Sequence, residues 1–193
     1  MELDRIKELA VYLSGINSDV EIYPQYGKLT ILRNVGKIPG ECDAQYVDFL
    51  CFSNGLKAYD YVFYGFKSKE LRPYMHENIG DLWVMLYMLA GTFWGFGSSS
   101  SGYNFGYVKK KDTQGNHYIG FYDMSYPEEV TLIASSFNIF MWKFLSGVKV
   151  AVKEGADIPI LDAAWFHGIG ESYYHDEELF SSEEARSDFR YEL

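Results

Sequence analysis

Cysteine is scarce in this sequence of 193 residues, and so are the residue groupings that hold metal ions. The two cysteines, Cys42 and Cys51, are too few for the disulfide framework of a small secreted protein. None of the four histidines lies three or four residues from another, so no helical pair of zinc ligands exists. A chain of this length buries about 70% of its unfolded surface and needs no cross-link to fold. We expect two free, buried thiols and no metal or other cofactor.

Long apolar runs are also missing. The longest run, from Leu82 to Ala90, has nine residues, whereas a membrane-spanning helix needs about 20. The first ten residues carry acidic side chains and no apolar stretch of the kind found in a secretory signal. We therefore expect a cytoplasmic protein that does not interact with a membrane.

Basic residues are in short supply, since 17 lysines and arginines stand against 27 acidic residues and the net charge is −10. The segment 171–193 contributes −6 of this charge through eight acidic residues and two arginines. An acidic surface repels phosphate, so direct binding to nucleic acid is not expected. The composition divides the chain into one domain over 1–170 and an acidic C-terminal tail over 171–193. The tail either stays solvated or docks through its apolar residues, which are Leu179, Phe180, Phe189 and Tyr191.

Helical and strand patterns follow one another without a sustained strand–helix–strand repeat. Apolar residues at helical spacing predict helices over 2–16, 43–53, 79–90 and from Ser135 or Ser136 to Gly147. Aromatic and β-branched residues predict two short strands within 20–33 and further strands over 59–66, 92–96, 103–107, 118–123 and 130–134. The clearest hairpin turns at Asp112–Asn116. This order favours an α+β fold with a largely antiparallel sheet and helices packed against it.

The sequence contains no arrangement of residues typical of catalysis. The glycine- and serine-rich segment 97–102 lacks the lysine and the following helix of a phosphate-binding loop, and we interpret it as a polar connection between strands. A general acid needs a pocket that raises its pKa, and an enzyme with a dispersed site would need His117 and Glu128 to line one such pocket. We therefore expect no enzymatic activity.

Aromatic side chains are abundant instead, at 18% of the residues. Most of them are expected in the core. The surplus of tyrosine suits a protein-binding face, because tyrosine is enriched at interfaces. The candidate partner-binding residues are Tyr59, Asp60 and Tyr61, together with the acidic Glu128 and Glu129. The competing interpretation of each is an ordinary exposed strand or turn residue.

Several segments in the middle of the chain resemble one known family. Residues 46–55, YVDFLCFSNG, resemble the Y-x-x-F-L-x-x-x-N-G signature of the SUKH superfamily. A strand (YDYVFYGF) soon follows the Asn-Gly, and an aromatic, glycine-containing hairpin and a helix that starts at Ser136-Phe137 come later, as in that family. The resemblance covers residues 40–147. The superfamily includes the yeast cell-wall-assembly regulator and many bacterial toxin-immunity proteins.

The resemblance implies an α+β fold without enzymatic activity and a role in binding proteins. Its bacterial branch implies an immunity protein that neutralises a cognate toxin, often a nuclease, by direct contact. An acidic protein suits such a partner, because the active site of a nuclease is basic and opposite charges speed association. The yeast branch implies the alternative of an intracellular regulatory scaffold. The least favoured alternative is an uncharacterised enzyme.

Overall fold

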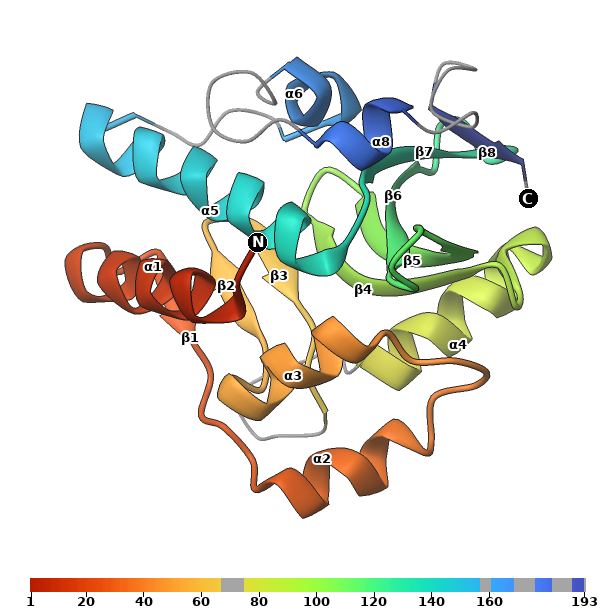
Figure 1. Cartoon of the computed structure of the whole chain (residues 1–193), viewed down its shortest axis with the longest axis horizontal. Coiled ribbons are helices and arrows are strands. Elements are labelled where there is room, and N and C mark those ends of the chain that lie inside the picture. Colours follow the sequence, from red (N-terminus) through yellow and green to blue (C-terminus); the bar gives the residue numbers. More distant parts are fainter. Residues whose placement is uncertain (67–74, 157–160, 169–175, 182–188, 193) are drawn as a thin grey trace.

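The strands of the described structure form one antiparallel sheet. The computed structural model describes residues 1–66, 75–156, 161–168, 176–181 and 189–192. Within these residues each strand pairs with the next strand along the chain (Figure 1), which confirms the predicted α+β fold with an antiparallel sheet. The strands are β1 (Val20–Ile22), β2 (Leu56–Ala58), β3 (Tyr61–Phe63), β4 (Phe93–Ser99), β5 (Tyr103–Lys111), β6 (His117–Asp123), β7 (Glu129–Ala134) and β8 (Arg190–Glu192).

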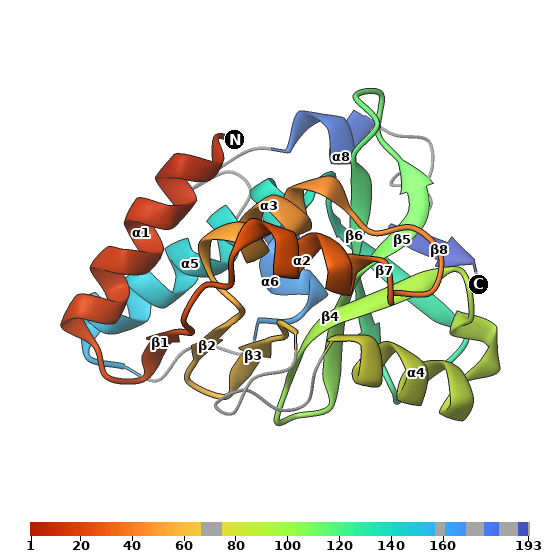
Figure 2. The same ribbon diagram turned by 90° about the horizontal axis from the view of Figure 1, so that it is seen from below.

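Helices pack against the sheet from both sides. The two longest helices, α1 and α5, lie side by side, and α4 runs next to β4 at the other end of the molecule (Figure 1 and Figure 2). The helices are α1 (Leu3–Ile16), α2 (Lys28–Val35), α3 (Ala44–Phe52), α4 (Met75–Met85), the 3-10 turn η1 (Tyr87–Leu89), α5 (Phe137–Glu154), α6 (Ala163–Gly168) and α8 (Glu177–Ser181).

Alternation along the strands divides the aromatic side chains between two apolar clusters. Phe63 and Phe105 belong to the larger cluster, in which the ring of Phe63 lies 4.7 Å from that of Phe144 on α5. Phe93 and Tyr122 belong to the smaller cluster, which includes apolar residues of α4 and α8. Neighbouring residues of a strand point to opposite faces, so each of the strands β4 to β7 supplies both clusters. Core packing therefore accounts for much of the aromatic excess.

The strongest local signals produce the elements they predict. β5 and β6 form the expected hairpin around residues 112–116. The Asp43 carboxylate caps α3 by accepting a hydrogen bond from the Tyr46 N–H at 2.8 Å. Ser136 caps α5 in the same way. These features depend on residues close together in the sequence, which is why the local sequence pattern predicts them.

Several predictions of local structure are wrong, including the helix over 79–90, because α4 begins at Met75 and ends at Met85. Residues 28–35, where the second of two short strands is expected, form α2, and this short helix buries only Ile31. The predicted end of α5 at Gly147 is also wrong, because the helix continues to Gly155, whose φ is +61°. Gly147 has a packing role instead, since a Cβ there would lie 2.5 Å from the ring of Trp165.

The segment expected to be a polar connection lies partly in a strand. Gly97, Ser98 and Ser99 complete β4 and pair with β3. A Cβ on Gly97 would lie 2.5 Å from the ring of Phe63, so a glycine is needed for the close approach of these two strands. Only the residues that follow, Ser100 to Gly102, make the turn into β5.

The described parts of the acidic C-terminal tail dock on the domain. Leu179 of α8 is fully buried, and β8 pairs with β7 to extend the sheet. The buried Asp176 accepts hydrogen bonds at 2.7 Å from both the backbone N–H and the hydroxyl of Ser135. Of the two interpretations of the tail, docking therefore holds for these residues, while 171–175 and 182–188 lie outside the described part.

His167 of α6 contacts both β7 and the C-terminal segment, and its protonation is expected to make the stability of the protein depend on pH. Its Nε2–H donates to the Leu132 carbonyl at 2.7 Å, and its ring lies 4.0 Å from that of Phe189. Burial lowers the pKa of His167 below its ordinary value of 6.5. Between these two pKa values the unfolded chain binds more protons than the folded chain, so stability rises with pH.

We expect acidification from pH 7 to pH 5 to lower the free energy of unfolding of the wild-type protein through this residue. The variant His167→Gln keeps a donor for Leu132 and should show a shallower fall in stability over this range. Urea unfolding at several pH values measures the difference. Equal pH slopes for the two proteins would contradict the assignment.

Candidate functional site

The residues of the family-like signature are structural. Tyr46 and Asn54 are completely buried, and the Tyr46 hydroxyl donates a hydrogen bond to the Tyr64 carbonyl. The Asn54 amide donates to the Phe66 carbonyl at 2.9 Å and accepts from the Phe66 N–H at 2.8 Å. A Cβ on Gly65 would lie only 2.0 Å from the Asn54 carbonyl oxygen. These contacts fasten the end of α3 to the chain after β3, so a partner must be recognised elsewhere.

Three hairpin turns meet at one end of the sheet. The turn between β2 and β3 contains Asp60, the turn between β4 and β5 contains Ser100, and the turn between β6 and β7 spans 124–128. The Asp60 carboxylate accepts a hydrogen bond from the Ser100 hydroxyl at 2.7 Å. Tyr103 pairs with Asp123, which places the third turn at the same end as the second. The fold thus brings both predicted groups of contact residues to one end of the strands.

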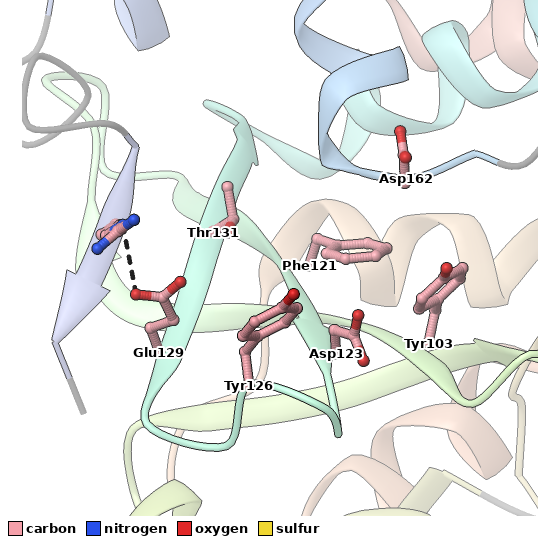
Figure 3. A pocket seen from close by; sticks show the side chains of 8 residues that line it. Tyr103, Phe121, Asp123, Tyr126, Glu129, Thr131 and Asp162 are labelled. Atoms are coloured by element: carbon pink, nitrogen blue, oxygen red, sulfur yellow. Dashed lines mark ion pairs between the residues drawn. The ribbon is translucent and has the colours of Figure 1, made fainter.

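A pocket of about 430 Å³ opens at this end, on the side from which the chain enters α6 (Figure 3). The rings of Tyr103 and Phe121 lie on its floor with their centroids 4.9 Å apart. Asp162 faces them from the segment before α6, while Asp123 and Tyr126 come from the end of β6 and the turn beyond it. The lining consists of Tyr103, Phe121, Asp123, Tyr126, Glu129, Thr131, Asp162 and Arg190.

Acidic side chains dominate the charge of this pocket. Asp123, Glu129 and Asp162 stand against the single base Arg190. Arg190 Nε lies 3.3 Å from Glu129 Oε2, and these side chains are 59% and 34% exposed. An exposed ion pair contributes little stability and exchanges readily for a competing partner. The rim residue Tyr126 is 66% exposed. Acidic walls over an aromatic floor suit a cationic side chain, which gains from both.

The structure separates the first group of predicted contact residues. Tyr59 is partly exposed, its hydroxyl accepts a hydrogen bond from the Asn17 amide, and its φ of +56° is rare for a residue other than glycine. Asp60 is exposed beside it. Tyr61 is only 3% exposed, and its hydroxyl accepts the Leu161 N–H at 2.9 Å, while burial raises its pKa to about 12. This corrects the prediction for Tyr61, because strand alternation turns it into the core.

The second group lies at the pocket. Glu129 is one of the lining residues, and Glu128 is exposed in an adjoining hollow of about 370 Å³ that shares Tyr126, Glu129 and Arg190 with it. Sequence reasoning missed Asp162, which lies far along the chain from β6.

The other missed residues had a signal in the sequence. Phe121 and Asp123 are two residues apart on β6, and Tyr103 on β5 pairs with Asp123, so the register of the predicted hairpin would have placed all three on one face. Asp162 had no such signal, because its position depends on how α5 and α6 pack.

The residues that a dispersed enzyme site would need do not come together. His117 begins β6 and Glu128 follows its far end. The His117 ring is buried, with its Nδ1–H donating to the Val108 carbonyl and its Nε2 3.3 Å from Glu41. Burial raises the pKa of Cys42 to about 11, so its thiol stays protonated at neutral pH. Among the described residues, no group of three or more His, Cys, Asp or Glu side chains is placed to hold a metal ion.

Comparison of the sequence with protein families and curated proteins does not assign this site to a known family. No family model matches the sequence, and no curated protein matches it. Within the described ranges, no helix has both the length and the apolar composition to cross a membrane. The geometry of the pocket and the SUKH-like pattern of residues 40–147 are therefore the two indications of function.

Proposed function

We propose that the chain is a SUKH-like protein-binding module that neutralises a cognate toxin by direct contact. The observation that carries the proposal is the acidic pocket with an aromatic floor at the end of β5, β6 and β7. It takes a lysine or arginine side chain of the toxin between Asp123 and Asp162, with the ring of Tyr103 beneath it. Arginine fits best, because its planar guanidinium pairs with carboxylates and stacks on aromatic rings.

The surroundings of the pocket support a basic partner. Arg190, which belongs to β8 in the acidic segment 171–193, lines one side of the pocket. Three acidic side chains of the lining stand against this one base, so the pocket carries a net negative charge. A field of this sign attracts basic surfaces such as the active site of a nuclease and speeds their association. The exposed Tyr126 and Glu128 at the rim extend the contact surface.

The test is co-purification with the toxin domain encoded beside this gene, followed by measurement of affinity and of toxin inhibition. We expect the double variant Asp123→Asn/Asp162→Asn to weaken binding by about tenfold or more and to reduce the salt dependence of association. The matched control Asp48→Asn/Asp81→Asn removes the same charge from exposed positions on α3 and α4 and should bind like the wild type.

The possible outcomes test the contact surface and the immunity function separately. Wild-type affinity in the Asp123→Asn/Asp162→Asn variant would move the contact surface away from the pocket. Failure of the wild-type protein to bind or inhibit the neighbouring toxin would overturn the immunity function. Several host partners and no toxin gene nearby would favour the regulatory scaffold instead.

A further inference from the structure

A second hollow, of opposite charge, lies between the two longest helices. It has a volume of about 600 Å³ and runs between α1 and α5, which lie side by side in both views (Figure 1 and Figure 2). The sequence builds it through helical spacing, because residues three, four or seven apart share one face of a helix. α1 supplies Arg5, Glu8 and Tyr12, and α5 supplies Trp142, Lys149 and Lys153.

The charge of this hollow is unusual for the molecule. Arg5, Lys149 and Lys153 outnumber the single acid Glu8, although the whole chain carries −10. In the described part of the chain none of these three bases forms an ion pair. Lys149 and Lys153 lie one helical turn apart, so their charges act on the same stretch of the groove. Among the residues that line it, the hollow therefore carries a net positive charge.

Apolar surface accompanies the positive charge. Tyr12 is 51% exposed, and Ile16 follows it one turn later with 51% of its surface exposed. Trp142 lines the opposite wall. A cluster of large exposed apolar residues on a helix is typical of a surface that contacts another protein. The groove thus offers both cationic and apolar contacts along α1.

We infer that this groove docks an acidic segment of a second protein, whose carboxylates pair with Arg5, Lys149 and Lys153 while its apolar side chains cover Tyr12. A nucleic acid fits less well, because three bases beside Glu8 in a chain of −10 do not offset the repulsion of phosphates. The described parts of the chain's own acidic tail are engaged elsewhere, since α8 and β8 both pack against β7. The inference goes beyond the toxin-binding proposal and uses none of its residues.

The first experiment is fluorescence anisotropy with a short fluorescein-labelled peptide in which glutamate alternates with leucine and phenylalanine. We expect saturable binding that weakens as salt is raised, and a loss of about tenfold in affinity for Lys149→Glu/Lys153→Glu. The matched control Lys28→Glu/Lys37→Glu makes the same charge change at exposed positions in and after α2 and should retain wild-type affinity. The variant Lys149→Gln/Lys153→Gln should give an intermediate loss, and circular dichroism checks that each variant is folded.

Other ligands are tested in parallel. No peptide binding, or equal loss in both Glu variants, overturns the inference. Binding of a single-stranded oligonucleotide or of anionic lipid vesicles that is lost on Lys149→Glu/Lys153→Glu assigns the groove to another class and also overturns it. Self-association that is lost with the same variant assigns the groove to a second copy and overturns it as well. Toxin affinity should stay unchanged in this variant, so the toxin-binding proposal and this one fail independently.

Discussion

Replacing Asn54 with alanine is expected to lower the free energy of unfolding by about 3 kcal/mol. The Asn54 side chain is completely buried, and its amide satisfies both the N–H and the carbonyl of Phe66. Alanine would leave these two backbone groups without partners in the core, and each unsatisfied buried group costs about 1–3 kcal/mol. Urea unfolding followed by tryptophan fluorescence measures the change.

The matched control for this prediction is Asn34→Ala. The partly exposed Asn34 side chain on α2 donates to the Thr30 carbonyl and accepts from the Lys37 ammonium, two solvent-accessible bonds whose loss should change stability by no more than about 0.5 kcal/mol. The variant Asn54→Asp supplies a second check. A protonated aspartic acid donates and accepts one hydrogen bond each, as the amide does, whereas the ionised form cannot donate. Its folded pKa is expected to be raised by burial, so Asn54→Asp should lose stability as pH rises through that pKa.

An Asn54→Ala protein as stable as the Asn34→Ala protein would contradict the stabilising role of the Asn54 side chain. In that case the Tyr46 and Gly65 contacts alone would hold the end of α3 to the chain after β3.

Removing the chain from Asp176 onward is expected to destabilise the protein by about 5 kcal/mol, enough to unfold most domains of this size. Leu179 is fully buried, and loss of a buried leucine side chain costs about 2–5 kcal/mol. Asp176 accepts three hydrogen bonds, two from Ser135 and one from the Leu179 N–H at 3.2 Å. The deletion also exposes the β7 edge that β8 covers.

Lys143 adds to the cost of this deletion. Its side chain is fully buried on α5, where burial lowers its pKa and the charge of Asp176 partly opposes that shift. Without Asp176 the ammonium group loses its nearby counter-charge, and an uncompensated buried charge is strongly destabilising. The single change Asp176→Ala should therefore be almost as harmful as Leu179→Ala.

Packing and charge are separated by single variants. The control Glu177→Gln removes a charge from an exposed residue of the same helix and should leave the free energy of unfolding nearly unchanged. Hydrogen exchange of the β7 amides should accelerate in the deletion and in Leu179→Ala, because the strand becomes an edge or loses its cover. A deletion variant with wild-type stability would show that the segment docks without contributing to the fold.

Some of this structure follows from the sequence because the responsible interactions are local. Asp43 and Ser136 cap helices by bonding to residues three positions ahead, and the turn at residues 112–116 sets the register of β5 and β6. The short α2 escaped prediction because its β-branched residues favour a strand locally, whereas the burial of Ile31 stabilises a helix. Gly147 resembled a helix end because glycine often terminates helices. Its actual role is the close contact with Trp165, which depends on tertiary packing and has no local sequence signal.

The candidate site divides in the same way. The placement of Glu128 and Glu129 at the start of a strand could be predicted, because a turn signal precedes that strand. Tyr61 is buried, because its position in the sheet and not its residue type decides which face its side chain occupies. Asp162 reaches the pocket only because α5 and α6 pack over the sheet.

The sequence by itself determined the α+β class, the antiparallel sheet, the main hairpin and the acidic excess, because periodicity, capping and charge are properties of neighbouring residues. Only the tertiary structure decided that β8 of the acidic segment joins the sheet, that Asp162 comes to lie over Tyr103 and Phe121 in one acidic pocket, and that Arg5, Lys149 and Lys153 line one groove. These features bring together residues that lie far apart along the chain. Such encounters are set by packing and strand register, which no local pattern encodes.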